Sequence, residues 1–80
     1  SEVYYNKGFS YYKLNFYHDA IKCYDETIEI NPNDSDAYFY KGLSLYKLNK
    51  YDEAIKSFDK AIEINPNDFS AYNNKGLSLE

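Results

Sequence analysis

The 80-residue chain has little sulfur and few residues that bend or break a backbone: one Cys, no Met, three Gly and two Pro. Because Cys23 is the single cysteine, an internal disulfide is impossible and a cysteine-based zinc site lacks its second sulfur. Glycine-rich phosphate loops and spaced His or Cys clusters are also missing, so the sequence predicts no cofactor and no metal site. Without disulfides a reducing compartment is the simpler expectation, which favours an intracellular, cytoplasmic protein.

Long apolar runs and an excess of positive charge are absent as well. The formal net charge is -4, and the lysines are interleaved with acidic residues, which argues against a nucleic-acid or anionic-membrane partner. No apolar run approaches the length of a membrane span. Aromatic residues are abundant instead, with 11 Tyr and 5 Phe in a chain that is 44% hydrophobic. This composition indicates a globular protein with many rings available for packing or for contact.

The sequence repeats itself with a period of 34 residues. Residues 1–34 and 35–68 align without a gap and agree at 21 of 34 positions, and residues 69–80 begin a third copy. Repeats of this length are typical of stacked supersecondary units. The sequence therefore predicts one unit over residues 1–34, a second over 35–68, and the first helix of a truncated third unit over 69–80.

Within each unit the apolar residues recur with helical periodicity, so we expect an all-α chain of five helices over residues 2–14, 18–31, 36–48, 52–65 and 70–80. The second helix of each unit has one apolar stripe, such as Ala54, Phe58 and Ala61. The first helices have two adjacent stripes, which is more apolar surface than one neighbouring helix covers. Asn-Pro-Asn-Asp strings end the second helices, and Asp34 is placed to cap the next helix.

A glycine recurs in the middle of each first helix, at Gly8, Gly42 and Gly76. Glycine there costs about 1 kcal/mol relative to alanine, so its recurrence predicts a compensating close approach between helices. We expect Ala20 and Ala54 to form the opposite walls.

The recurring pattern resembles the tetratricopeptide repeat (TPR) family over the whole chain. The family has aromatic residues at unit positions 4, 11 and 24, small residues at 8, 20 and 27, and proline at 32. The matching residues are Tyr4, Gly8, Tyr11, Ala20, Tyr24, Pro32, Tyr38, Gly42, Ala54, Phe58, Ala61, Pro66, Tyr72 and Gly76. Thr27 and Leu45 depart from the pattern. The resemblance implies a right-handed α-solenoid of antiparallel helix pairs, with about two and a third TPR units and with the first helices lining its concave face.

The resemblance further implies a protein-protein interaction scaffold rather than an enzyme. On the family template the residues facing the groove are Tyr5, Asn6, Phe9, Tyr12, Phe39, Tyr40, Leu43, Tyr46, Asn73 and Leu77. They include the second apolar stripes of the first helices. Rings with a few polar tips suit an extended or helical peptide, so we expect a protein or peptide partner in an aromatic concave groove.

Chaperone tails are the best-known ligands of this family, and they are gripped by a two-carboxylate clamp of Lys, Asn and Arg. The corresponding residues are Tyr5, Phe9, Tyr40, Ser70 and Asn74. Because all five differ from the clamp residues, the sequence predicts a groove without this clamp.

An alternative function is structural. The predicted helix 70–80 has no following second helix to cover it, so the solenoid has an open C-terminal end. A module of this kind self-associates or domain-swaps through that end, which would make the chain a homo-oligomer.

Two further groups of polar residues have structural explanations. His18 and Cys23 project about 140° apart on one helix, so no nucleophile and base are paired and no catalytic residue is indicated. Cys23 is expected to be a semi-buried structural thiol. The carboxylates of Asp25 and Glu29 are expected on a solvated face.

Overall fold

The structure contains four α-helices in the part of the chain that it describes. It is a computed structural model that describes residues 2–67, with side chains from residue 6 onward. The helices are α1 (Glu2–Lys13), α2 (Tyr17–Ile30), α3 (Ser35–Lys47) and α4 (Tyr51–Ile64). They confirm the first four predicted helices, and each ends one residue earlier than expected. The predicted helix over 70–80 lies outside the described residues.

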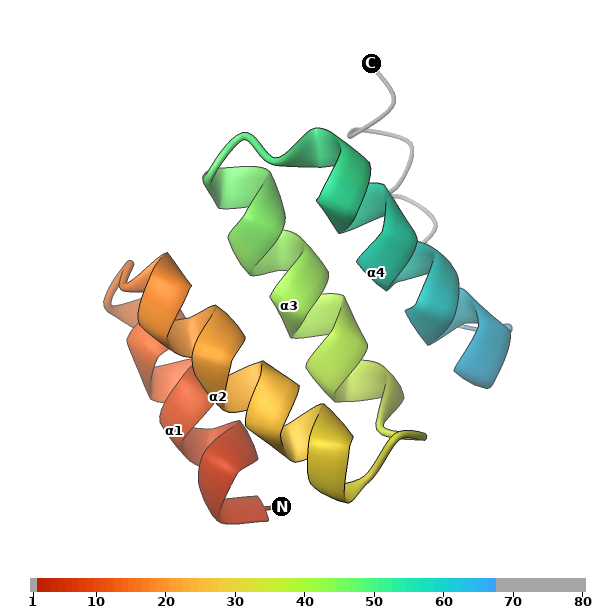
Figure 1. The fold of residues 1–80 in the computed structure, drawn as a ribbon, viewed down its shortest axis with the longest axis horizontal. Helices are drawn as coiled ribbons and strands as arrows, with labels where there is room; N and C mark the ends of the chain where they lie inside the picture. The colour runs from red at the N-terminus through yellow and green to blue at the C-terminus, as the bar shows by residue number, and fades with distance from the viewer. Residues whose placement is uncertain (1, 68–80) are drawn as a thin grey trace.

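The four helices form two pairs that lie side by side (Figure 1). Each helix packs against the next along the chain, and α1 also contacts α3. The contact between α1 and α3 brings the two first helices together. Their second apolar stripes therefore become parts of one shared surface.

The turn inside each unit is closed by an asparagine in the left-handed conformation, with φ of 67° at Asn15 and 64° at Asn49. After Asn49, the Lys50 N–H donates to the Leu45 carbonyl at 2.9 Å, which is the hydrogen bond of a Schellman motif. The hydroxyl of Tyr51 donates to Asn49 Oδ1 at 2.7 Å. The same bonds recur around Asn15 in the first unit. The same hydrogen-bonded turn therefore sets the angle between the two helices in each pair.

The loop between the units satisfies one of the free N–H groups at the start of α3. Asp34 Oδ1 accepts a hydrogen bond from the Ala37 N–H at 3.1 Å, so the predicted cap is confirmed. Just before it, Asn31 Oδ1 accepts from the Asn33 N–H at 3.3 Å and tightens the turn around the proline. The loop therefore ends α2 and starts α3 within four residues.

The core lies mainly along the second helices, as their single apolar stripes predict. The fully buried residues of α2 and α4 are Ala20, Tyr24, Thr27, Ala54, Phe58 and Ala61. On α3, Ala37 and Ser44 are also fully buried, and Ala37 packs with the cluster of α2. The hydroxyl of Ser44 donates to the Tyr40 carbonyl at 2.9 Å, which satisfies it inside the helix. The apolar stripes of the sequence did not include these two small residues.

The mid-helix glycines lie directly against buried rings. A Cβ placed on Gly42 would lie 2.6 Å from the ring of Phe58, and one on Gly8 would lie 3.0 Å from the ring of Tyr24. The predicted close approach of the helices is confirmed. The prediction that Ala20 and Ala54 form the opposing walls is wrong. The nearest opposing atoms belong to the rings of Tyr24 and Phe58 and, for Gly8, also to Cys23.

Candidate peptide-binding face

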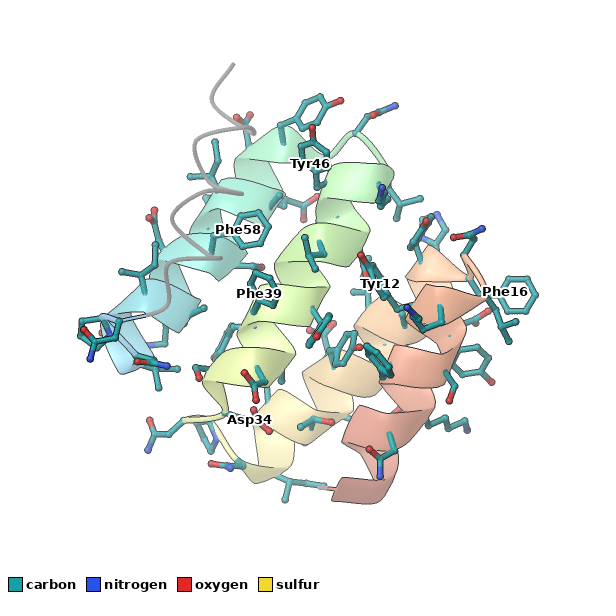
Figure 2. All side chains as sticks on the ribbon, turned by 180° about the vertical axis from the view of Figure 1, so that it is seen from behind. Tyr12, Phe16, Asp34, Phe39, Tyr46 and Phe58 are labelled. Carbon is teal, nitrogen blue, oxygen red and sulfur yellow. The ribbon has the colours of Figure 1, made fainter. Side chains whose placement is uncertain are left out.

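Side chains of α1 and α3 form a surface of partly buried rings, which we call the aromatic face. The members that the structure describes are Phe9, Tyr12, Phe39, Tyr40, Leu43 and Tyr46, with exposed Asn6 at the edge. Figure 2 shows Tyr12 between α1 and α3, and Phe39 between α3 and α4. All of these residues were predicted for the groove, and each keeps part of its side chain accessible.

Tyr40 is the centre of the aromatic face. Its ring centroid lies 5.3 Å from that of Phe9, 5.8 Å from Tyr12 and 5.1 Å from Phe39, all in edge-to-face geometry. It also stacks at 6.1 Å on Tyr24 of α2. Rings in these geometries attract one another by about 0.5–1.5 kcal/mol per pair beyond their burial. Tyr40 therefore joins the two first helices and ties the aromatic face to the core.

Two further rings extend this network and were not predicted. Tyr17 lies 5.9 Å from Tyr12, and Tyr51 lies 5.4 Å from Tyr46. Both occupy the same position of their units and both donate to the asparagine of the turn. The recurrence of tyrosine at this position in both units was the signal in the sequence that could have found them.

The surroundings of Tyr12 favour the neutral form of its phenol. Burial raises the pKa of Tyr12 above its usual 10.0, and the nearby Tyr17 and Tyr40 add to the effect. The Tyr12 hydroxyl is therefore a donor at neutral and mildly alkaline pH. Lys13 Nζ lies 5.7 Å from the ring centroid of Phe9, so a cation borders the face. The surface combines apolar area with a few polar groups at its edge.

The other predicted residues are distributed as follows. Gly8, Ala20, Tyr24, Gly42, Ala54, Phe58 and Ala61 are buried, Tyr11 and Tyr38 are partly buried, and Pro32 and Pro66 are exposed. The side chains of Tyr4 and Tyr5 lie outside the described part, as do Tyr72, Asn73, Gly76 and Leu77. The open C-terminal end proposed for self-association also belongs to that undescribed segment.

Polar residues such as His18 and Cys23, for which the sequence indicated structural roles, support no catalytic or metal centre in residues 2–67. His18 is exposed, whereas Cys23 is only 5% exposed, and burial raises the pKa of its thiol. A thiol with a raised pKa is a poor nucleophile. The described residues contain no cluster of three or more His, Cys, Asp or Glu side chains suited to a metal ion. No helix among them is long and apolar enough to cross a membrane.

One carboxylate of the expected solvated face is exposed as predicted but also contacts the next unit. Asp25 of α2 is half-exposed, but its Oδ1 lies 2.6 Å from Nζ of Lys41 on α3. The ion pair crosses from the first unit to the second, so Asp25 contributes to the contact between units. Its neighbour Glu29 is exposed, as expected.

These features define an all-α repeat protein built from helix pairs that share a face, and the family comparisons agree. The tetratricopeptide repeat model matches residues 1–34 and 35–68, and a second tetratricopeptide repeat model matches residues 57–80. The chain belongs to the tetratricopeptide repeat family, whose domains are typically non-catalytic binding modules. A comparison with curated protein sequences gives no significant match.

Solved structures of TPR domains superpose closely on the chain. The first TPR of Spaghetti (RPAP3) bound to the HSP90 peptide SRMEEVD has a TM-score of 0.92 and 25% identity, over 95% of this chain and 60% of that one. The TPR2B domain:pHsp70 complex of yeast Sti1 has a TM-score of 0.93 and 34% identity, over 96% and 62%. MamA has a TM-score of 0.94 and 31% identity, over 96% and 42%. The chain thus spans less than two thirds of each of these structures.

Proposed function

We propose that the chain is a non-catalytic protein-binding module that holds a peptide or helix of a partner protein on its aromatic face. Two repeat units over residues 1–34 and 35–68 supply this face in the proposal. Residues 69–80 add a further first helix of a right-handed solenoid, on which Asn73 and Leu77 extend the face. Tyr5 contributes from α1.

The ring network centred on Tyr40 is the observation that carries the proposal. Its rings come from both first helices, contact one another at centroid distances of 5.1 to 5.8 Å, and remain partly accessible. Rigid rings give a ligand large contact area at low entropic cost. The ligand that this surface favours has apolar side chains for the rings and polar groups that pair with Asn6 and the Tyr12 hydroxyl.

A chaperone-tail clamp is not part of the proposal, although two of the similar structures hold peptides or partners named for HSP90 and Hsp70. At two of the positions where the clamp needs amides, this chain has Phe9 and Tyr40, and their rings contact each other. Phe9 offers no hydrogen-bond donor, and Tyr40 offers a single phenolic O–H where an asparagine would offer two N–H donors, so this pair is a poor match for two carboxylates. We therefore expect an apolar ligand rather than an acidic tail.

The ligand class is tested with peptides. Fluorescence anisotropy with labelled SRMEEVD should show no saturable binding at concentrations that saturate the RPAP3 domain, which serves as the positive control. Binding of comparable strength would contradict the exclusion of the clamp.

The site is tested with peptides selected for binding from a displayed library. Phe9→Ser should weaken their binding at least about tenfold, because the substitution removes a ring of the face that contacts the central Tyr40. The matched control is Phe16→Ser, which removes a ring that is 53% exposed at the turn before α2. If both variants bind like the native chain, the aromatic face is not the site. Phe39→Ser is less suitable, because Phe39 packs against the buried cluster that contains Phe58 and its loss would also lower stability.

A further inference from the structure

The polar groups of the aromatic face are rich in hydrogen-bond donors. Tyr12 and Tyr46 each contribute a phenolic O–H, Asn6 contributes an amide group, and the ammonium group of Lys13 lies beside the ring of Phe9. None of the described members of the face is a carboxylate, so no side chain on it is an acceptor alone. The face therefore suits a ligand backbone that presents carbonyl groups and few N–H groups.

The apolar part of the face consists of rings that contact one another. The centroid of Tyr40 lies 5.3 Å from that of Phe9 and 5.8 Å from that of Tyr12, with interplanar angles of 76° and 63°. Phe9 and Tyr12, both on α1, are 6.5 Å apart at an angle of only 28°. Rings at these distances touch, so the branched side chain of a leucine has no room to enter between them. The rings offer flat surfaces, which flat and rigid ligand groups cover best.

A cationic ligand is disfavoured on these rings, although aromatic faces attract positive charge. The ammonium group of Lys13 already lies 5.7 Å from the centroid of Phe9, and it would repel a second cation on the same ring. The pyrrolidine ring of proline is neutral and rigid, and the residue has no N–H, which matches a face rich in donors. Proline-rich segments adopt the extended polyproline II helix, whose carbonyl groups make no internal hydrogen bonds.

We infer that the ligand of the aromatic face is a proline-rich segment of a partner protein in the polyproline II conformation. Its prolines pack on the accessible rings of Phe9 and Tyr40, and its carbonyl groups accept hydrogen bonds from Tyr12 and Asn6. The inference rests on the proposed function, since it names the ligand of the same face. Because such a segment is ordered before it binds, it loses less conformational entropy than a flexible peptide.

The ligand is tested with a labelled peptide of Pro-Pro-Ala repeats, added to the 80-residue chain. Fluorescence anisotropy should show saturable binding. The matched peptide has sarcosine in place of each proline, so it lacks the same N–H groups but has neither the pyrrolidine ring nor its fixed φ. We expect the sarcosine peptide to bind at least about tenfold more weakly, because it has lost both the ring contacts and the preformed conformation.

Two variants of the chain separate the ring contacts from the hydrogen bonds. Phe9→Leu keeps an apolar side chain but removes the aromatic ring, and it should weaken binding of the proline-rich peptide about fivefold. Tyr12→Phe keeps the ring and removes the donor, and it should weaken binding about fivefold, the typical net contribution of one hydrogen bond. The control Tyr11→Phe removes a hydroxyl from the ring of α1 that lies beside Phe16, outside the aromatic face, and should have no effect. An unchanged circular dichroism spectrum verifies that each variant is folded.

The outcomes distinguish this inference from the proposed function. If library-selected peptides bind and lose affinity with Phe9→Ser while the proline-rich peptide does not bind, the inference is wrong and the proposed function stands. If neither kind of peptide binds, both are wrong.

Three further results would overturn the inference alone. One is equal binding of the sarcosine peptide. Another is binding of the proline-rich peptide that is unchanged by both Phe9→Leu and Tyr12→Phe, because the peptide would then lie elsewhere. The third is displacement of the selected peptides by a leucine-rich helical peptide but not by the proline-rich one, which would assign the face to a helix.

Discussion

Replacing Gly42 with alanine should destabilise the chain by about 2 kcal/mol, even though alanine is the better helix former. Alanine gains about 1 kcal/mol over glycine in a helix interior, and neither described glycine has a positive φ that would oppose the change. The new Cβ would lie 2.6, 2.8 and 3.0 Å from three atoms of the Phe58 ring. That ring is fully buried, so overpacking costs about 3 kcal/mol, the upper end for an added methyl group.

Gly8→Ala is the matched control, since its Cβ would meet Tyr24 and Cys23 at 3.0 to 3.2 Å. Small shifts relieve contacts of this length, so overpacking there costs about 1 kcal/mol and the net change is close to zero. Urea unfolding followed by circular dichroism measures both variants. The reasoning fails if Gly42→Ala is as stable as Gly8→Ala. In the Phe58→Leu background the penalty of Gly42→Ala should largely disappear, and its persistence would show that another contact is responsible.

Two further predictions concern the turn and the aromatic face. Asn49→Ala should lower the free energy of unfolding by about 1–2 kcal/mol, because alanine is strained at a φ of 64° and the Tyr51 hydroxyl loses its acceptor. The control Asn49→Gly should retain most of the stability. Equal losses of stability for both variants in urea titrations would contradict this prediction. The raised pKa of Tyr12 means that the folded chain holds this proton more tightly than the unfolded chain, so its contribution to stability is complete below about pH 10 and is lost as the pH rises. Urea titrations between pH 9 and about 11.5 should therefore show a smaller decline for Tyr12→Phe than for the native chain, and parallel declines would contradict it.

The sequence was sufficient to predict the four described helices because periodicity, proline positions and capping residues all act locally. The Asp34 cap and the stripe that contains Phe58 appear where the spacing placed them. The side chains opposite the glycines were harder to predict. Gly42 faces a ring rather than Ala54 because the long side chain at position 58 reaches under α3, and the length and rotamer of a side chain are not visible in a spacing pattern.

The aromatic face was predictable as a set of residues but not as a network. Its members follow from the second apolar stripe, whereas the central role of Tyr40 depends on how two helices from different units approach each other. The ion pair of Asp25 with Lys41 escaped prediction for the same reason, because its partners lie 16 residues apart and in different units. Pairings across units require the angle between helix pairs, which one sequence does not supply.

The position of Tyr40 links ligand choice to the joint between the repeats. A substitution there alters the surface offered to a ligand and, at the same time, loosens the ring contacts that hold α1 and α2 to α3. A substitution of Tyr40 made to change ligand specificity would therefore lower the thermal stability of the chain before it reached the limit set by ligand affinity. The exposed residues at the edge of the face, Asn6 and Lys13, carry no such penalty. They are the positions at which an engineer could retarget the module while leaving the joint between its repeats intact.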